Sequence, residues 1–228
     1  MPNTRIPGTA WGVEEVMKLF HVDASIRHEG SISRELAAIF REQWLEAHPE
    51  GTVTHRDLAA DPLPHLTGPE FEAAMTPPDR RTDEQREKLA LQRRIVDEVL
   101  DADAYLIATP IYNWSAPSSL KAWVDRLMMD RALPEKLAGR PAVIVMAKGG
   151  AYGPGTPKEG WDFAEPWLRR VFGEQIGLDL EVVAAELTLA DVNPAMSHLK
   201  DVARESLATA RKAAARHGGE LGRKLAAA

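Results

Sequence analysis

A buried strand that leads directly into a proline-bracketed loop constrains the fold of this chain most strongly. The uninterrupted apolar run at residues 104–108 is typical of a strand covered on both faces, as in a parallel sheet. Pro110 ends that strand, because proline cannot donate a hydrogen bond to a neighbouring strand. Pro117 suits the first turn of a helix that begins near Ser118, with Ser115 as a candidate cap. Strand, short loop and helix together predict half of a β–α–β unit.

The rest of the chain repeats this alternation. Apolar or alternating runs predict further strands, at residues 18–22, 52–58, 142–147 and 180–189. Amphipathic or alanine-rich segments predict helices at residues 34–48, 82–101, 118–131, 160–176 and 197–226. The stretch at residues 61–83 is expected to be an irregular excursion with one short helix. This pattern predicts an α/β fold with a parallel sheet, in which the strands at 104–108 and 142–147 are central.

Composition excludes several classes of function. The 228 residues suffice for one domain with a sizeable core, and the net charge of -6 argues against a nucleic-acid partner or an anionic membrane surface. The absence of cysteine excludes disulfides, thiolate metal sites and iron–sulfur clusters. No apolar run reaches the ~20 residues of a membrane span. We therefore expect a cytoplasmic protein with an N-terminal extension over residues 1–16 and a single domain over residues 17–228.

The loop after the first predicted strand carries the residues best suited to bind an anion. Ser25, Ser31 and Ser33 offer three hydroxyl groups at the start of a helix, where backbone N–H groups are free to bind phosphate. The segment matches neither the phosphate loop of nucleotide triphosphatases nor the glycine fingerprint of dinucleotide-binding folds. Simple capping of the helix by Ser31 and Ser33 is the structural alternative.

Two further loops follow the central strands. Tyr112, Asn113 and Trp114 combine aromatic rings with a carboxamide, which suits the edge of a flat, partly polar ring. The pair Gly149–Gly150 lets the backbone approach a ligand closely. Core aromatics and an ordinary turn are the structural alternatives. Because the carboxyl ends of parallel strands share one edge of the sheet, the three loops together predict a site for a flat cofactor with a phosphate tail.

The sequence predicts no metal site. Along the chain the seven histidines show no paired metal-binding spacing such as His-x3-His, at His21, His28, His48, His55, His65, His198 and His217. Asp57 and Asp61 flank a turn and are expected to cap it or to form salt bridges.

These segments resemble the FMN-dependent NADH-azoreductases, a family of flavodoxin-like fold whose members are also quinone reductases. The resemblance covers residues 17 to about 215, and its matching pieces occur in the family's order: Ser25-Ile26 with Ser31-Ile32-Ser33, residues 56–64, Pro110-Ile111-Tyr112-Asn113-Trp114 with Leu120-Lys121 and Asp125, and Lys148-Gly149-Gly150-Ala151-Tyr152. The Pro-x-Tyr-Asn-Trp motif with Leu-Lys six residues after its tryptophan is the most specific of these pieces.

The resemblance implies a flavodoxin-like five-stranded parallel sheet in the order 2-1-3-4-5, with helices on both faces. It implies that Ser25, Ser31, Ile32 and Ser33 hold the phosphate of FMN. It also implies that the isoalloxazine ring is bordered by Ile111, Tyr112, Asn113, Trp114, Ala147, Lys148, Gly149 and Gly150. Tyr152 matches a family position near the flavin face where substrates stack, and we hypothesise that it donates a hydrogen bond to the electron acceptor. Family members are homodimers with two sites at the subunit interface.

The function expected from this resemblance is two-electron transfer from NADH or NADPH through FMN to a quinone or an azo compound, in a ping-pong cycle. One departure leaves the donor and the acceptor open. After Asp125 the family usually has a Gly-x-Thr-Phe segment and a longer loop, and residues 126–134 here are shorter and lack it. Two alternatives remain: a flavodoxin-type electron carrier that serves a protein partner, and a flavin-free structural or regulatory α/β domain.

Overall fold

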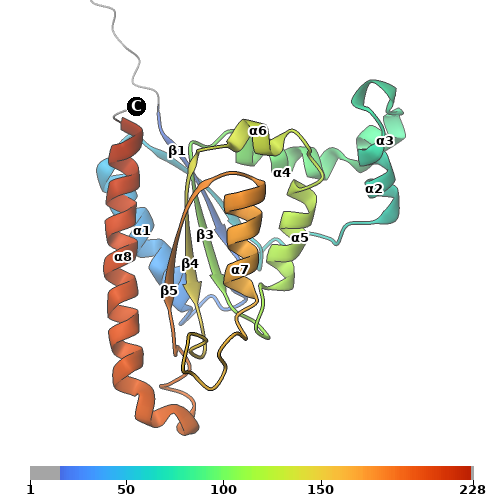
Figure 1. Ribbon diagram of the computed structural model, residues 1–228. Helices are drawn as coiled ribbons and strands as arrows, with labels where there is room; N and C mark the ends of the chain where they lie inside the picture. Colours follow the sequence, from blue (N-terminus) through green and yellow to red (C-terminus); the bar gives the residue numbers. More distant parts are fainter. Residues whose placement is uncertain (1–15, 227–228) are drawn as a thin grey trace, which may run out of the picture.

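A parallel sheet forms the centre of the molecule in the computed structural model, which describes residues 16–226 (Figure 1). Within this part of the chain the five strands lie in the order β2-β1-β3-β4-β5, and every neighbouring pair is parallel. Their bounds are β1 Lys18–Asp23, β2 Thr52–Asp57, β3 Ala104–Pro110, β4 Pro141–Ala147 and β5 Asp179–Ala185. The order implied by the resemblance is confirmed, and so is the inner position of β3 and β4.

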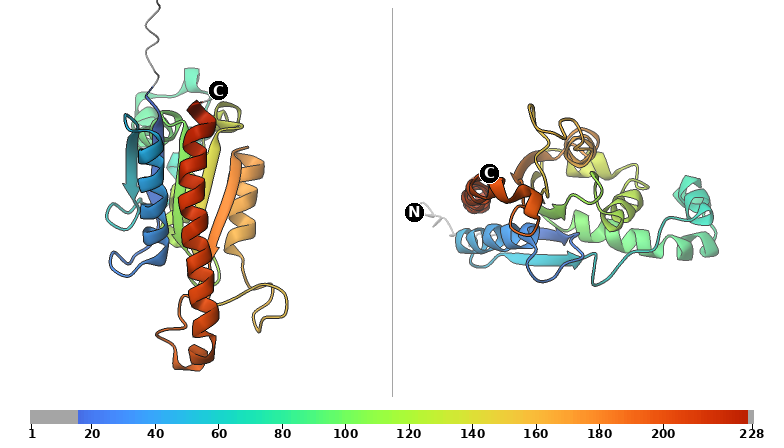
Figure 2. Two further views of the ribbon diagram at one scale, coloured as in Figure 1. Left: turned by 90° about the vertical axis from the view of Figure 1, so that its left-hand side faces the viewer. Right: turned by 90° about the horizontal axis from the view of Figure 1, so that it is seen from below.

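Helices cover both faces of the sheet (Figures 1 and 2). On one face, α1 (Ile32–Ala47) and α8 (Lys200–Ala226) lie side by side. On the other lie α4 (Ala90–Leu100), α5 (Ser118–Leu127), α6 (Leu133–Leu137) and α7 (Ala164–Leu168), the last continued by the π-helical segment η2 (Arg169–Gln175). A short 3-10 segment, η3 (Pro194–Leu199), precedes α8. Alternate residues of each strand point to opposite faces, so the sheet separates two apolar cores.

Each core contains large aromatic side chains that fix the helices on the sheet. Under α4 to α7, Trp123 stacks between Phe20 and Phe172, with ring centroids 6.1 and 6.0 Å apart. Under α1 and α8, Phe40 and Trp44 are fully buried. Both apolar groups consist of residues that the periodicity of the sequence places on one helix face or one strand face, and their burial drives the folding of this domain.

Helices α1 and α8 approach each other closely where Gly218 faces α1. A Cβ atom at Gly218 would lie 2.3 Å from the carbonyl oxygen of Phe40. Glycine inside a helix costs stability relative to alanine, so its presence here reflects the close contact between the two helix backbones.

Several predicted boundaries were wrong. The helix expected over residues 82–101 divides at Leu89 into α3 (Asp83–Lys88) and α4, although Thr82 caps it as predicted, in a capping box with Gln85. The last strand ends at Ala185 rather than at residue 189, because Leu187 adopts a positive φ of 59° and turns the chain. The helix expected from residue 160 begins only at Ala164.

Ser115 does not cap α5, contrary to prediction. Its backbone exchanges two hydrogen bonds with Tyr112, and Pro117 occupies the cap position without a side-chain bond. Helix α6 was not predicted; it follows α5 after a short turn at residues 128–132.

The excursion after β2 forms an arm that projects away from the sheet (Figure 1). We define the arm as residues 67–88, which comprise α2 (Gly68–Met75), the 3-10 turn η1 (Pro78–Arg80) and α3. Buried Arg126 holds its base: Nη1 lies 2.8 Å from Oε1 of Glu70, and Nε donates to the carbonyl of Pro64 at 3.0 Å. The expected excursion with one short helix is confirmed at α2, and the contacts of Arg126 fix its base.

Among the described residues, no helix is long and apolar enough to cross a membrane. The predicted N-terminal extension lies outside the described residues, apart from Val16, which is exposed.

Candidate active site

The three loops singled out in the sequence open on one edge of the sheet. They follow the carboxyl ends of β1, β3 and β4, which end at Asp23, Pro110 and Ala147. Figure 1 shows these ends at the lower edge of the sheet, and the right-hand view of Figure 2 looks onto that edge. Because β1, β3 and β4 are consecutive neighbours, the loops at their ends lie next to one another. The predicted convergence is confirmed.

Three serine hydroxyls meet at the start of α1, and we call them the serine cluster: Ser25, Ser31 and Ser33. Oγ of Ser31 lies 3.0 Å from Oγ of Ser25 and 3.3 Å from Oγ of Ser33. Ser31 is also the N-cap of α1 and accepts from the backbone N–H of Arg34. The capping alternative is thus present, but it uses one hydroxyl of the three. Oγ of Ser25 also accepts from the backbone N–H of Arg27 at 3.3 Å. Grouped hydroxyls next to the N–H groups of a first helical turn form a donor set that fits a phosphate group.

An ion-pair network centred on Arg34 lies next to the serine cluster and holds the loop that carries it. Arg34 donates to both carboxylate oxygens of Asp57 at 2.8 Å, to Oδ2 of Asp23 at 3.1 Å and to the carbonyl of Ser25 at 2.7 Å. The bonds from Arg34 lower the pKa of Asp57 to about 2. Asp57 also accepts from the backbone of Ala59, so the expectation that it would cap a turn and form a salt bridge is confirmed. Arg34 thereby joins β1, β2 and the loop between β1 and α1, residues 24–31, which we call the anion loop.

The second loop is a tight turn with strained backbone. Asn113 and Trp114 have positive φ values of 47° and 65°, and the flanking Tyr112 and Ser115 close the turn with backbone bonds of 2.9 and 3.0 Å. A positive φ is uncommon for a bulky aromatic residue, and such strain is typical of functional sites. The hydroxyl of Tyr112 accepts from the backbone N–H of Ile26 at 3.3 Å. This second loop, residues 111–117, is therefore in direct contact with the anion loop.

The third loop is anchored by a buried lysine. Nζ of Lys148 lies 2.7 Å from carboxylate oxygens of both Asp162 and Glu165, and we call these three residues the lysine cluster. Burial alone would lower the pKa of Lys148, but the two carboxylates outweigh it and raise that pKa. For the acid Glu165 the signs are opposite: burial alone would raise its pKa, but the contacts with Lys148 and Arg169 outweigh burial and lower that pKa. The lysine cluster ties the start of loop 148–163 to its end.

Close packing at the two glycines shapes the same loop. A Cβ atom at Gly149 would lie 2.8 Å from Cδ1 of Leu189, and one at Gly150 would lie 3.6 Å from the hydroxyl of Tyr152. The ring of Tyr152 therefore lies close to the glycine backbone. Burial raises the pKa of Tyr152, so the phenol stays protonated near neutral pH and can donate a hydrogen bond.

Exposed aromatic rings gather where the second and third loops meet, and we call them the aromatic cluster: Trp114, Trp161 and Phe163. The rings of Trp114 and Trp161 contact edge to face, with centroids 5.2 Å apart. The backbone N–H of Phe163 donates to the carbonyl of Trp114 at 2.9 Å. All three side chains are exposed, and the ammonium of Lys158 lies over the ring of Trp114, 5.6 Å from its centroid. An exposed group of rings is suited to stack on a flat molecule.

Most of the predicted site residues come together, with two qualifications. Ile32 packs into the core beneath α1, so its side chain does not face the loops. The ammonium of Lys148 is taken up by its carboxylates, and its backbone N–H donates to the carbonyl of Ala185 at 2.8 Å. Ile32 would thus offer a ligand only its backbone N–H, and Lys148 would border a ligand without a side-chain bond.

Sequence reasoning missed the residues that support the site. It placed no role on Arg34 or on the partners of Lys148, and it treated His21 and His55 as isolated. The two-residue alternation could have placed His21 and Asp23 on one face of β1 and His55 and Asp57 on one face of β2, but only the register of the two strands brings these pairs together. Burial lowers the pKa of His21, so its imidazole is neutral near pH 7.

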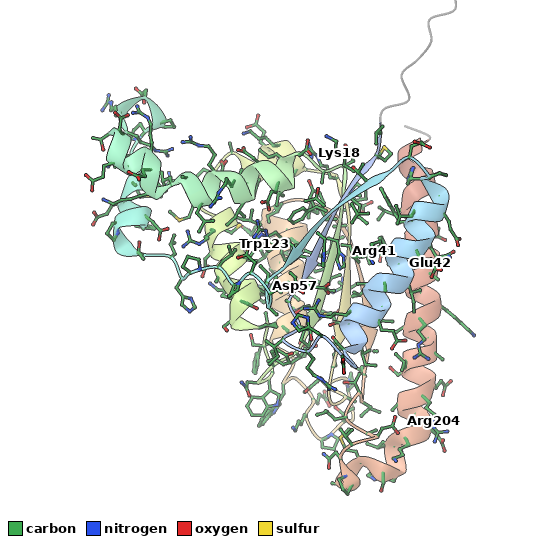
Figure 3. All side chains as sticks on the ribbon, turned by 180° about the vertical axis from the view of Figure 1, so that it is seen from behind. Lys18, Arg41, Glu42, Asp57, Trp123 and Arg204 are labelled. Carbon is green, nitrogen blue, oxygen red and sulfur yellow. The ribbon has the colours of Figure 1, made fainter. Side chains whose placement is uncertain are left out.

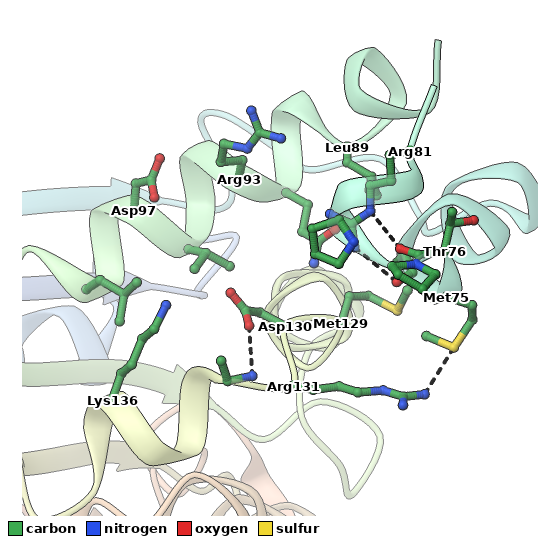
Figure 4. Close-up of a pocket in the computed structure, with 17 residues that line it drawn as sticks. Met75, Thr76, Arg81, Leu89, Arg93, Asp97, Met129, Asp130, Arg131 and Lys136 are labelled. Atoms are coloured by element: carbon green, nitrogen blue, oxygen red, sulfur yellow. Dashed lines mark hydrogen bonds between the residues drawn. The ribbon is translucent and has the colours of Figure 1, made fainter. Parts of the chain in front are cut away.

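A separate cavity of about 480 Å³ lies between the arm, α4 and the start of α6 (Figure 4). Its walls carry Met75, Arg81, Arg93, Met129 and Lys136. None of its lining residues belongs to the three loops, so this cavity is not part of the candidate site.

Comparisons with known proteins agree with the observed fold. A family model described as "Flavodoxin-like fold" matches residues 17–210. The chain is 42% identical over 202 residues to a protein of Frankia casuarinae called FMN-dependent NADH:quinone oxidoreductase, with 86% of this chain and 96% of that protein covered. This chain belongs to that family of flavodoxin-like oxidoreductases. A Streptomyces coelicolor member of the same name is 41% identical, with 92% of this chain and 97% of the relative covered.

Solved structures share the fold. An azoreductase from Bacillus anthracis superposes with a TM-score of 0.74 at 23% identity, covering 90% of this chain and 100% of that chain. An FMN-dependent NADH-azoreductase from the same species, solved in complex with FMN, gives a TM-score of 0.70 at 20% identity, with 89% and 100% covered.

Proposed function

We propose that this protein is an FMN-dependent oxidoreductase that transfers electrons from NADH or NADPH to quinones, azo compounds or both. The observation that carries the proposal is the serine cluster beside the strained turn at Tyr112–Ser115, on one edge of a flavodoxin-like sheet. An anion site and a ring-binding loop in contact match a flat cofactor with a phosphate tail. Relatives with more than 40% identity that carry the name FMN-dependent NADH:quinone oxidoreductase support the assignment.

Each part of the site has a separate task. The serine cluster and the first N–H groups of α1 would bind the phosphate, and Arg34 would keep the anion loop in place. The backbones of residues 111–114 and 147–150 would border the isoalloxazine ring. When bound, FMN supplies the capacity to take up a hydride and to pass on two electrons. The aromatic cluster would stack flat donors and acceptors and keep water from the ring face.

Tyr152 is the side chain best placed to assist the acceptor. It lies over the glycine backbone, and its raised pKa keeps the phenol protonated. We expect Tyr152→Phe to lower turnover with a quinone while FMN affinity is unchanged, because only the donated hydrogen bond is lost. Unchanged turnover would remove this role.

A homodimer fits the exposed apolar residues of the arm. Phe71 and Met75 are exposed on α2, which stands away from the sheet, and a second copy could cover them. Light scattering of the purified chain would measure the assembly state directly. The cytoplasmic location expected from the sequence stays a prediction.

Steady-state kinetics test the function. FMN-loaded protein should oxidise NADH or NADPH continuously when benzoquinone or an azo dye is supplied, and parallel double-reciprocal plots would indicate the ping-pong cycle. Bound flavin without sustained turnover of either donor would contradict the enzyme and favour a flavodoxin-type electron carrier.

A further inference from the structure

Beside the anion site, the structure brings together residues that the sequence keeps apart. We propose that His21, Asp23 and His55 form a binding site for a divalent transition-metal ion of the zinc class, which would join β1 to the edge strand β2. This inference does not depend on the proposed oxidoreductase function, and it reverses the sequence-based expectation of no metal site.

Strand geometry creates the cluster. His21 and Asp23 are two residues apart on β1 and therefore point to the same face of the sheet. His55 is the direct neighbour of His21 on β2. Two residues on one strand and a third opposite them on the next strand present three side chains to one point. Spacing along the chain cannot show this, because the strands lie in different parts of the sequence.

The distances suit a small coordination shell. Oδ2 of Asp23 lies 2.9 Å from Nε2 of His55 and 3.6 Å from Nε2 of His21. Bonds of about 2.0–2.1 Å at a tetrahedral ion separate neighbouring ligand atoms by about 3.3 Å, which falls between these two distances. One ligand atom from each residue can be chosen so that all three lie within 4.8 Å of one another.

Several buried polar atoms of this cluster also lack a hydrogen-bond partner. His21 is 3% exposed and Asp23 is 4% exposed. Within the described part of the chain, neither ring nitrogen of His21 has a hydrogen-bond partner, and nor does Oδ1 of Asp23. A buried polar atom without a partner costs stability, and an ion held by one histidine nitrogen and the carboxylate would remove part of that cost.

Neighbouring charges leave room for a cation. Arg34 is fixed mainly by Asp57 and by the carbonyl of Ser25, and it occupies only Oδ2 of Asp23. The two histidine nitrogens approach this same Oδ2, which would bind the ion and keep the hydrogen bond from Arg34, an arrangement common for metal-bound carboxylates. Arg41 on α1, labelled in Figure 3, adds a positive charge that acts on His21. Asp57 at the end of β2, also labelled there, pairs with Arg34 and so compensates the charge of that guanidinium.

The chemistry of the ligands selects the ion. Two imidazoles and one carboxylate favour zinc and its neighbours over magnesium or calcium, which prefer all-oxygen shells. The imidazole rings are stacked, with centroids 4.5 Å apart, so a shared ion requires them to tilt. His55 has room for this movement, because its side chain is 37% exposed. Water would complete the shell on that exposed side.

Metal titration of the full-length, tag-free chain tests the proposal. The protein is first treated with a chelator and freed of flavin. Calorimetry with Zn²⁺ should then give one site per chain, and Co²⁺ should produce the visible absorption of a cobalt ion with nitrogen ligands. His55→Gln keeps a hydrogen bond to Asp23 but removes the imidazole, and it should weaken binding more than tenfold.

Two further variants make the result decisive. The exposed His65 lies outside the cluster, and His65→Ala should bind the metal as the wild type does. His21→Gln should weaken binding as His55→Gln does; should it fail to fold, His55→Gln alone decides the question. No stoichiometric binding, or equal binding by the His55→Gln and His65→Ala variants, would overturn the proposal and leave only the hydrogen bonds of Asp23 with His55 and Arg34.

Discussion

Replacement of Lys148 by methionine should destabilise the flavin-free protein by about 3 kcal/mol. The ammonium makes two contacts of 2.7 Å, with Asp162 and Glu165, and lies 3.8 Å from Glu186. Removing one partner from a buried ion pair costs roughly 3–5 kcal/mol, because the remaining charge is left without compensation. The side chains of Asp162 and Glu165 are 12% and 23% exposed, so water recovers part of the loss and the lower end of that range applies.

Urea denaturation measures this effect. With a slope of about 2–3 kcal/mol/M, a loss of about 3 kcal/mol moves the midpoint down by roughly 1–1.5 M. Lys88→Met is the matched control, because Lys88 forms a solvent-exposed pair with Glu84, and such pairs contribute about 0–1 kcal/mol. Equal midpoints for the two variants would refute the reasoning. Measurements without FMN keep ligand binding from adding to the apparent stability.

The same pair of proteins gives a pH signature. The pKa of Glu165 is lower in the folded protein than in the unfolded chain. Its contribution to stability is therefore complete above the unfolded value of 4.5 and is lost as pH falls through the folded value. The difference in unfolding free energy between the wild type and Lys148→Met should be constant near neutral pH and should shrink below about pH 4.5. A difference that grows on acidification would contradict this assignment.

Three other substitutions test separate features of the structure. Ser33→Ala should weaken FMN binding about tenfold by flavin fluorescence, because one hydroxyl of the serine cluster is lost, whereas exposed Ser197→Ala should leave the affinity unchanged. Asn113→Val should lower the free energy of unfolding, measured in urea, by roughly 1–2 kcal/mol, because valine tolerates the positive φ poorly. Asn113→Gly should change it little, and equal effects of the two substitutions would contradict the turn geometry. Gly218→Ala should lower the melting temperature, because its Cβ would meet the carbonyl of Phe40 and overpacking costs about 1–3 kcal/mol, whereas Gly68→Ala faces open space and should not lower it.

The fold could be predicted because its signals are local. The apolar runs of β3 and β4 and the alternation along β2 identify strands from neighbouring residues alone. The shared edge of the three loops follows from the rule that parallel strands end on one side. The break at Leu89 was missed because no proline or glycine marks it, although α3 itself carries only polar residues. The prediction that the last strand extends to residue 189 was wrong, because Leu187 turns the chain within an apolar run.

The supporting residues could not be predicted for the opposite reason: their partners are distant in the sequence. Lys148 meets Asp162 and Glu165 only after the third loop has folded back on itself. His21 meets His55 through the register of β1 against β2, which no spacing along one segment encodes. The role of Arg34 likewise depends on Asp23 and Asp57, which end two different strands.

The most direct test of the proposed function is the visible spectrum of the purified protein after incubation with FMN and removal of the excess. We predict retained oxidised-flavin bands that bleach when NADH or NADPH is added without oxygen. Ser33→Ala should retain less flavin in the same experiment, which connects the signal to the serine cluster. A wild-type protein that retains no flavin would leave the fold standing and would contradict the function proposed for the three loops.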